Sequence, residues 1–343
     1  MSPKYEIRAA LPGDESRLLE LARFLNTVNL PNDPHEIAAL LERSQASFAQ
    51  TIPDYRLREY VFLLVERESK RALGTSLIIA QLGRRDAPYI YFEVRIEERY
   101  SGTLDRHFVH QVLRIGYSYN GPTEIGGLVV HPEARRLPEK LGMLISYVRF
   151  LFLALHRKRF QPRVLAELLP PLEPDGTSHL WEAVGRHFTG LSYREADRLS
   201  KQNKEFIRGL FPAGDIYVSL LPPQAQAVIG RVGAQTRGVE KLLQRIGFRY
   251  WNRVDPFDGG PHFVADMDEI SLIRRAFVGR AEIREPRNGV TKALVAVERE
   301  VPPYFLAVPA FIEHNAEQVC IDPPTARALD VRSGERLCVL PLD

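Results

Sequence analysis

One stretch of the chain combines residue types that could bind an anion. Residues 123–150 read TEIGGLVVHPEARRLPEKLGMLISYVRF, so an apolar run leads into a basic turn and then into an apolar segment of helical length. A strand, a basic turn and a helix N-terminus in this order can hold a pyrophosphate, because free backbone N–H groups and the helix dipole face the charge. The spacing matches neither GxxxxGK[ST] nor GxGxxG, so an ordinary strand–turn–helix connection is the alternative interpretation. The candidate anion-binding residues of the turn are Arg135, Arg136, Lys140 and Gly142.

Length and composition are those of an ordinary globular protein. The chain has 343 residues, of which 45% are hydrophobic and 26% charged, and its net charge is +3. A dedicated nucleic-acid binder would carry clustered basic residues, which this small charge argues against. The longest apolar stretch, residues 150–155, is too short to cross a bilayer, and residues 1–12 lack the apolar core of a signal peptide. With only Cys320 and Cys338, which fit a reduced compartment, we expect a cytoplasmic protein with no nucleic-acid or membrane partner.

Alternating strand and helix patterns surround the anion-binding stretch. The apolar periodicity predicts strands at 5–8, 60–66, 74–81, 89–97, 124–130 and 164–169, and helices at 14–25, 34–48 and 143–157. Residues 106–115 fit either a helix or a loop. Further along, residues 239–250 read as a short amphipathic helix closed by Gly247 and followed by an aromatic strand. Such an alternation is typical of an α/β fold.

Two parts of the chain depart from this alternation. Residues 173–224 contain helical patterns separated by Pro- and Gly-bearing loops, which predicts a helical insertion. The insertion either shapes a ligand pocket or forms a structural flap or an oligomer contact. From about residue 281 the sequence changes to short β patterns around one short helix at 323–329. We therefore predict a main domain of residues 1–280 and a small β-rich accessory unit of residues 281–343.

An ordered series of residues along the chain resembles one known family. The series comprises His131-Pro132, Arg149-Phe150, Ala166-Glu167, Leu180–Gly185, Phe188, Ala196-Asp197, Phe206-Ile207, Ile216-Tyr217, Ala225–Gly230 and Asp255–Pro261. It is similar to the arginine N-succinyltransferase family over about residues 5–273. The segments at 123–150 and 239–250 also resemble the hallmark segments of the GNAT acyl-CoA N-acyltransferase fold. The resemblance implies a GNAT-like α/β core and transfer of a succinyl group from succinyl-CoA to the α-amine of L-arginine, a first step in arginine catabolism.

The resemblance also implies where succinyl-CoA binds. Its pantetheine arm would lie along the strand at 124–130, where Leu128 matches a family succinyl-CoA contact and Val130 lies beside it. The basic turn would hold the pyrophosphate, and its two arginines either contact phosphate or remain solvated surface charges. The turn is longer than in the family and keeps only the second of two glycines, Gly142, with Lys140 in place of the first. Lysine exchanges close backbone contacts for a flexible point charge, so we expect coenzyme A to bind in an altered way.

The proton acceptor for amine acylation does not follow from the resemblance. The family's catalytic histidine lies in a Gly-Gln-Val-His-Pro-Gln-Thr phrase, and this chain has Gly233 at the histidine position. Glycine cannot transfer a proton, so another group would have to do so. Candidates are Glu124, at the start of the cofactor strand where GNAT enzymes often have a carboxylate base, and the histidines His262 and His187. The alternatives are a solvated carboxylate, packed or surface histidines, and an inactive paralogue that pairs with a catalytic subunit.

Two aspartates are candidates for the acceptor site that the resemblance implies. Asp255 and Asp258 flank a tight turn and could contact the guanidinium of L-arginine, or they could cap the turn through their own backbone. Direct attack of the amine on the thioester needs no metal. The expected ligands are therefore L-arginine and succinyl-CoA without a metal, in a possible homo- or hetero-oligomer. The alternative functions are a non-catalytic partner subunit of a catalytic paralogue, and an N-acyltransferase with a different donor or amine.

Overall fold

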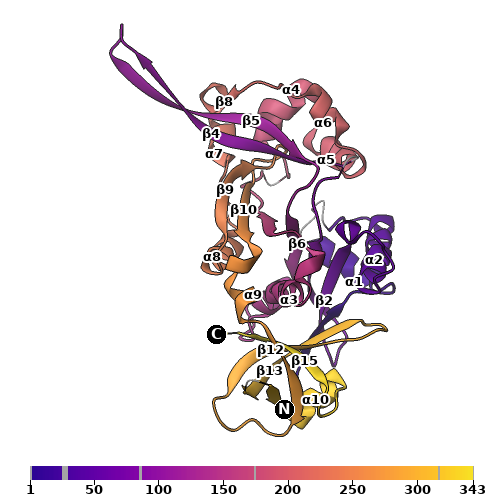
Figure 1. The fold of residues 1–343 in the computed structure, drawn as a ribbon. Helices are drawn as coiled ribbons and strands as arrows, with labels where there is room; N and C mark the ends of the chain where they lie inside the picture. Colours follow the sequence, from indigo (N-terminus) through magenta and orange to yellow (C-terminus); the bar gives the residue numbers. More distant parts are fainter. Residues whose placement is uncertain (1, 25–29, 85–86, 174, 316, 343) are drawn as a thin grey trace. The chain divides into compact units, whose positions relative to one another are not determined.

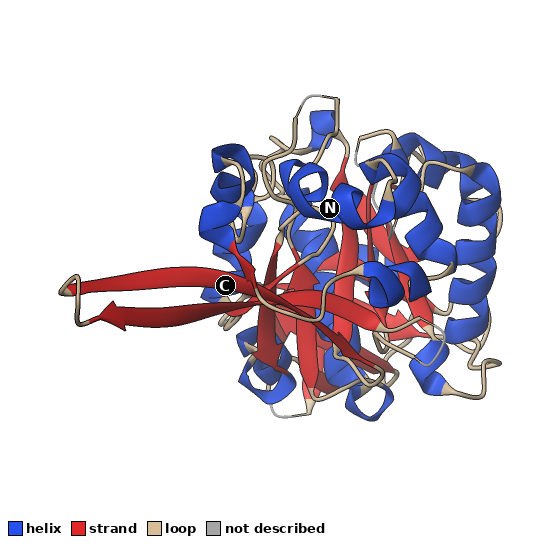
Figure 2. Ribbon diagram, turned by 90° about the horizontal axis from the view of Figure 1, so that it is seen from above, coloured by secondary structure: helices blue, strands red, loops and turns tan. Residues whose placement is uncertain are grey.

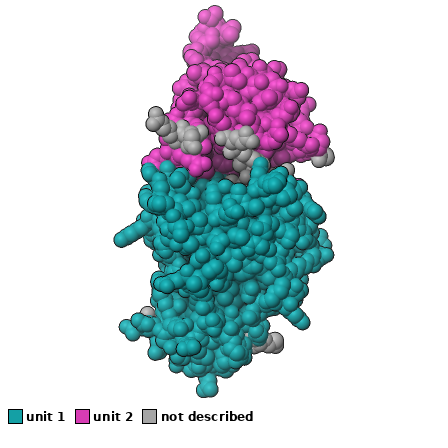
Figure 3. All heavy atoms as spheres, turned by 90° about the vertical axis from the view of Figure 1, so that its right-hand side faces the viewer, with its two compact units in different colours: residues 1–81, 123–162, 267–343 teal, residues 82–122, 163–266 magenta. Residues whose placement is uncertain are grey.

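The structure is a computed structural model that describes residues 2–24, 30–84, 87–173, 175–315 and 317–342. The chain forms two compact units that interleave along the sequence, and Figure 3 colours them separately. Unit 1 comprises residues 1–81, 123–162 and 267–343, and unit 2 comprises residues 82–122 and 163–266. Residues 281–343 are thus one part of unit 1, and the insertion is part of unit 2. The division at residue 280 as a domain boundary stays a prediction.

Unit 1 is a mixed β-sheet with helices (Figure 1). Its strands are β1 (Tyr5–Ala9), β2 (Glu59–Glu66), β3 (Ala72–Ile79), β6 (Thr123–Val130), β11 (Phe277–Ile283), β12 (Thr291–Glu298), β13 (Phe305–His314), β14 (Gln318–Ile321) and β15 (Arg336–Pro341). Its helices are α1 (Glu15–Ala22), α2 (Pro34–Phe48), α3 (Leu141–Leu155), α9 (Ser271–Arg275) and α10 (Pro323–Leu329). Within the unit the strands follow the order β12-β15-β11-β14-β13-β1-β2-β3-β6.

Helices pack on the sheet of unit 1 through alternating side chains of β2. Val61, Leu63 and Val65 lie in one buried cluster with apolar residues of α1 and α2. Phe62, between them in sequence, contacts Phe152 of α3 with ring centroids 5.5 Å apart. Because successive strand side chains point to opposite faces, β2 is covered on both sides and reads as a continuous apolar run. Among the described residues, no helix is both long and apolar enough to cross a membrane.

Unit 2 is built on a further run of strands with the helical insertion packed on them. Its strands are β4 (Tyr89–Ser101), β5 (Arg106–Ser118), β7 (Arg163–Glu167), β8 (Ile216–Tyr217), β9 (Arg249–Val254) and β10 (Pro261–Asp266), in the order β7-β10-β9-β4-β5-β8. Its helices are α4 (Arg186–Thr189), α5 (Tyr193–Gln202), α6 (Glu205–Leu210), α7 (Pro223–Val228) and α8 (Arg237–Arg245). The prediction of helices within residues 173–224 is confirmed.

The interpretation of residues 106–115 as helix or loop is wrong, because they lie in strand β5. β4 and β5 pair from Tyr89↔Ser118 to Ser101↔Arg106 and form a long two-stranded ribbon, seen clearly in Figure 2. Side chains such as Ile96 and Val109 are 63% and 58% exposed there. A ribbon without a buried face at its outer end shows no apolar alternation, which is why the sequence pattern did not indicate a strand.

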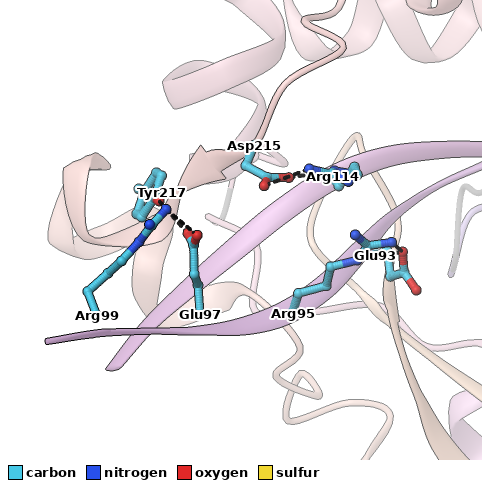
Figure 4. A network of polar contacts seen from close by, with 7 residues as sticks. All are labelled: Glu93, Arg95, Glu97, Arg99, Arg114, Asp215 and Tyr217. Carbon is cyan, nitrogen blue, oxygen red and sulfur yellow. Dashed lines mark hydrogen bonds and ion pairs between the residues drawn. The ribbon is translucent and has the colours of Figure 1, made fainter. Parts of the chain in front are cut away.

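Polar contacts link the ribbon to the segment around β8 (Figure 4). The guanidinium of Arg114 donates from Nε to Asp215 at 2.6 Å and from Nη2 at 2.8 Å, a bidentate pair. Further out, Glu97 accepts from both Arg99 and the hydroxyl of Tyr217. The arginine contacts are solvent-exposed and each contributes little free energy, so they orient the ribbon more than they stabilise it.

The two faces of the unit 2 sheet differ in chemistry. Ile90, Phe92 and Val254 lie in a buried apolar cluster with Trp181 and other residues of the insertion. Because strand side chains alternate, the odd-numbered residues of β4 point to the opposite face. That face carries polar and aromatic side chains from several strands, and it forms the second candidate site described below.

Candidate functional site

Strand β6 of unit 1 carries a β-bulge where the sequence placed a cofactor contact. β6 pairs with β3 as Leu77↔Gly126 and then as Thr75↔Val129, so Gly127 and Leu128 together oppose one residue. Gly127 has φ +54°, a conformation that glycine adopts without steric cost. Such a bulge bends a strand and re-aims its side chains. Leu128, which is half-buried, therefore lies at the point where β6 leaves regular pairing.

A buried arginine of α3 supports the bulge. Arg149 is 2% exposed and donates from Nη1 to the carbonyl oxygen of Gly126 at 3.4 Å. It also donates from Nε and Nη2 to the backbone and hydroxyl of Ser146 at 3.1 and 2.8 Å. Burial lowers the pKa of Arg149 to about 9. Within the described chain no carboxylate pairs with it; carbonyl and hydroxyl oxygens accept its hydrogen bonds, and the ring centroid of Phe150 lies 6.0 Å from its Cζ.

The turn after β6 keeps a glycine-like backbone at Lys140. Lys140 is the N-cap of α3 and has φ 56° and ψ 49°, the left-handed conformation that a residue with a Cβ adopts at a cost of about 1–2 kcal/mol. A Cβ on Gly142 would lie 3.5 Å from Cγ2 of Val130, so the first turn of α3 packs closely against the end of β6. Lys140 therefore adopts the backbone conformation that glycine favours, although it carries a lysine side chain.

The two arginines of the turn have different surroundings. Arg135 donates from Nε to the carbonyl oxygen of Val130 at 3.0 Å, which ties the turn to the end of β6. Arg136 is exposed. The structure thus brings the predicted cofactor-binding residues together around the end of β6 and the N-terminus of α3; they are Leu128, Val130, Arg135, Arg136, Lys140 and Gly142. Glu124, the predicted base, is buried at the start of the same strand.

His262 is the centre of the second candidate site, on unit 2. It is fully buried on β10, and its Nδ1 lies 2.7 Å from the hydroxyl oxygen of Tyr89. Its Nε2 has no hydrogen-bond partner among the described residues and lies 3.4 Å from Oε1 of Glu167. Burial, together with the charges of Arg253 and Lys204, lowers the pKa of His262 to about 3. The imidazole is therefore neutral at physiological pH.

Two carboxylates lie next to the free nitrogen of His262. Glu167 is its direct partner in the β7–β10 pairing, and Asp255 follows β9. One oxygen from each carboxylate and one ring nitrogen of His262 all lie within 4.8 Å of one another. Two carboxylates and a neutral imidazole can hold an ammonium, a guanidinium or a divalent metal ion. The expectation that no metal is needed therefore stays a prediction.

Asp255 and Asp258 cap the turn between β9 and β10. Oδ1 of Asp255 accepts a hydrogen bond from the backbone of Phe257 at 2.6 Å, and Oδ1 of Asp258 accepts from Gly260 at 2.7 Å. Burial raises the pKa of both carboxyl groups, and Asp255 raises that of Asp258 further. In each aspartate, one carboxylate oxygen thus caps the turn, as one of the two interpretations of the sequence predicted. Of the two, Asp255 is the one whose carboxylate also joins the group around His262.

An arginine between two aromatic rings completes this face. Cζ of Arg253 lies 3.7 Å from the ring centroid of Tyr91 and 3.7 Å from that of Trp251. Sequence reasoning did not find this residue. The available signal was the Trp251-Asn252-Arg253 phrase next to the aspartate turn, but its meaning depends on Tyr91, which is far away in sequence.

The position of the family histidine has no room for a side chain. The backbone N–H of Gly233 donates to the carbonyl oxygen of Leu169 at 2.9 Å. A Cβ on Gly233 would lie 2.7 Å from the carbonyl oxygen of Pro170, closer than real Cβ contacts come. Thr236 also donates its hydroxyl to Leu169 at 3.0 Å, which fixes the loop. The other histidine candidate, His187, is an exposed residue of α4 outside the group around His262.

Comparison with known proteins gives consistent matches over nearly the whole chain. Residues 5–272 match a family described as "Arginine N-succinyltransferase beta subunit". The chain is 32% identical over 328 residues to arginine N-succinyltransferase of Enterobacter sp. (strain 638), covering 95% of this chain and 93% of that relative. It is 29% identical to the protein of that name from Yersinia pestis (strain Pestoides F), covering 98% and 97%. Among solved structures, arginine/ornithine succinyltransferase subunit AI from Pseudomonas aeruginosa aligns with a TM-score of 0.83 and 27% identity over 99% of each chain.

Proposed function

The chain belongs to the arginine N-succinyltransferase family, and we propose that it transfers a succinyl group from succinyl-CoA to the α-amine of L-arginine. The family makes it an acyltransferase that takes an acyl-CoA as co-substrate. The observation that carries the proposal is the match in sequence over 95% of the chain to a relative of that name. The predicted α/β fold of this acyltransferase class is confirmed.

The donor would bind along β6 and at the N-terminus of α3. At the bulge the backbone leaves regular pairing, so its amide groups are available to a pantetheine arm near Leu128 and Val130. The backbone N–H of Met143 already donates to the carbonyl oxygen of Lys140 at 2.9 Å. The N–H groups of Leu141 and Gly142, at the very start of α3, would therefore face an anion placed before the helix. Lys140 and Arg136 add positive charge at the same place, and both are exposed. The bulge and the positive N-terminus of α3 thus favour a thioester that carries a diphosphate, and we propose succinyl as its acyl group.

The acceptor amine would be held by the carboxylates beside His262. Glu167 and Asp255 can pair with an ammonium or guanidinium group, and the neutral Nε2 of His262 can exchange a hydrogen bond with an amine. A general base works best with a pKa near the working pH, and a pKa of about 3 makes His262 a weak base in the free protein. Glu124 and His262 therefore remain two separate proposals for the proton acceptor, while Asp258 would support the turn that positions Asp255.

Release of free thiol from succinyl-CoA tests the proposal directly. The purified chain is mixed with succinyl-CoA and L-arginine, with L-ornithine as a second amine and acetyl-CoA as a second donor. Enzyme-like thiol release that requires the amine supports the proposal, and its absence with every donor and amine contradicts it. In the same assay, Glu124→Gln should lower turnover and remove the acidic limb of the pH–rate profile if Glu124 is the base. An unchanged profile would exclude that role.

A non-catalytic subunit is the second candidate function. Both the matched family description and the similar solved structure are named as subunits. The β4–β5 ribbon exposes large apolar side chains, of which Ile96, Tyr100 and Leu104 are 63%, 67% and 66% exposed, and such residues commonly mark contacts between subunits. Light scattering shows whether the purified chain binds a paralogue, and the thiol assay is then run on the chain alone and on the mixture. Thiol release only in the mixture favours the subunit role. A cytoplasmic location stays a prediction.

A further inference from the structure

We propose that Arg253 is a substrate-binding residue that takes a carboxylate, either the α-carboxylate of the amino-acid acceptor or the free carboxylate of the succinyl group. This inference rests on the proposed function and deepens it. On the polar face of unit 2, Arg253 is stacked between two rings and has no acidic partner among the described residues. It also interacts with Tyr89, the partner of His262.

The stacking leaves only the edge of the guanidinium available. The rings of Tyr91 and Trp251 each lie 3.7 Å from Cζ of Arg253, one on β4 and one on β9. A guanidinium carries its N–H donors in its plane, so rings above and below hold it by cation–π attraction without using those donors. The in-plane edge is the part that binds a carboxylate with two parallel hydrogen bonds. The clamp therefore pre-orients Arg253 for a planar anion.

An irregular stretch of β9 builds this clamp. β9 pairs with β10 as Pro261↔Val254 and then as Phe263↔Tyr250, so three β9 residues lie opposite His262 alone. Asn252, the middle one, has φ +51°, which asparagine tolerates better than most residues. Bulges re-aim side chains and are frequent beside active sites. Here the irregularity lies at the level of the buried histidine.

No acidic side chain neutralises Arg253 among the described residues. Its Cα partner on β4 is Glu93, but the carboxylate of Glu93 is paired with Arg95. Among the described residues, Arg253 contacts the two rings and interacts with the hydroxyl of Tyr89. A half-buried cation held rigidly without a counter-charge is well suited to bind an anionic group of a ligand.

The neighbouring charges match an amino acid. Tyr89 interacts with Arg253 and lies 2.7 Å from Nδ1 of His262. The other nitrogen of His262 lies 3.4 Å from Glu167, and Asp255 belongs to the same group. One face thus presents a cation and, beyond Tyr89, a pair of carboxylates. An α-amino acid carries a carboxylate and an ammonium on one carbon, so it complements both. An amine without the carboxylate would leave Arg253 without a partner.

Paired substrate ratios test the proposal. The values of kcat/KM are measured for arginine against agmatine, which lacks the carboxylate, and for succinyl-CoA against acetyl-CoA. If Arg253 binds the α-carboxylate, Arg253→Gln reduces the arginine/agmatine ratio at least about tenfold and leaves the donor ratio unchanged, because a charge-assisted pair is lost. If the ratio of kcat/KM for succinyl-CoA to that for acetyl-CoA falls instead, the carboxylate that Arg253 binds is that of the succinyl group. If neither ratio moves, the proposal is wrong.

Two controls keep the result interpretable. Arg208→Gln removes an exposed arginine of α6 that donates to the hydroxyl of Tyr119 at 3.3 Å, and it should leave both ratios as in the wild type. Arg253→Lys keeps the charge and loses the two parallel N–H donors of the guanidinium. The substrate ratio that falls in Arg253→Gln should therefore, in Arg253→Lys, lie between the wild-type and Arg253→Gln values. Arg253→Lys also serves if Arg253→Gln does not fold, which circular dichroism would reveal; a wild-type ratio for a folded Arg253→Lys would then contradict bidentate binding.

Calorimetry separates this inference from the proposed function. Arginine, agmatine, succinate and acetate are titrated into the wild type and the variants, with saturating coenzyme A present. Tighter binding of arginine than agmatine, or of succinate than acetate, that disappears in Arg253→Gln supports the carboxylate site even if no acyl transfer occurs. Normal acyl transfer with no such discrimination in either protein overturns the site and leaves the proposed function standing.

Discussion

The hydroxyl oxygen of Tyr89 lies 2.7 Å from Nδ1 of His262, and both side chains are buried. Burial raises the pKa of Tyr89 well above its usual value, and Glu167 raises it further, so the hydroxyl stays protonated. Burial also lowers the pKa of His262 to about 3, so the imidazole stays neutral. A neutral hydroxyl and a neutral imidazole share one short hydrogen bond, which holds the ring with Nε2 toward Glu167.

Tyr89→Phe should lower both stability and turnover. The change leaves Nδ1 of a buried histidine without its partner, which costs about 1–3 kcal/mol of unfolding free energy. The freed ring no longer has a fixed orientation, so we expect kcat to fall more than KM rises, with a shifted pH–rate profile. Urea unfolding and steady-state kinetics check this. Tyr117→Phe, which removes an exposed hydroxyl on the ribbon, is the matched control and should behave like the wild type. Unchanged kinetics in Tyr89→Phe would assign the contact a purely structural role.

Stability should decrease in acid because of His262. Its folded pKa is about 3, below the ordinary value of 6.5, so between these values the unfolded chain binds a proton that the folded protein does not. Protonation of His262 therefore does not affect the unfolding free energy above about pH 6.5. Between about pH 6.5 and pH 3, each pH unit downward lowers the unfolding free energy by up to about 1.4 kcal/mol. Urea unfolding of wild type and His262→Asn between about pH 7.5 and pH 5 measures the difference in slope. Parallel curves would mean that His262 is protonated in the folded protein.

Lys140→Gly should stabilise the chain. Lys140 holds a left-handed conformation at the N-cap of α3, and glycine removes a steric cost of about 1–2 kcal/mol, partly offset by its larger entropy in the unfolded state. We expect a net gain of up to about 1 kcal/mol in urea unfolding. Lys140→Ala loses the same charge but keeps the strain, so it should be less stable than Lys140→Gly. Equal stability of the two variants would show that the charge, not the backbone, matters here.

Restoring the family histidine at position 233 should fail. A Cβ there would lie 2.7 Å from the backbone oxygen of Pro170, so even Gly233→Ala should cost about 1–3 kcal/mol by forcing the loop to shift. Gly233→His should lose at least as much stability and gain no activity. Gly214→Ala is the control, because nothing lies within 4 Å of its Cβ position. A stable and more active Gly233→His would mean that this loop rearranges readily.

Local signals in the sequence were enough for many single elements. Helix α2 begins at Pro34 after Asp33, whose side chain accepts from two backbone N–H groups, and its predicted bounds are confirmed. The apolar run of β6 and the long apolar helix α3 were equally readable. The helix lies two residues earlier than predicted at both ends, and the strand begins one residue earlier. Capping and apolar periodicity act within a few residues, so they can be recognised without knowing the tertiary structure.

Only the tertiary structure decided which side chains meet. The sequence placed His262 beside a turn, but its contacts with Tyr89 and Glu167 depend on the pairing of strands that are far apart along the chain. The clamp around Arg253 likewise needs the irregular β9 and its neighbour β4. One register shift would turn each of these side chains to the other face of the sheet. That is why the composition of this site was partly visible in the sequence, whereas its geometry became visible only when the strands were paired.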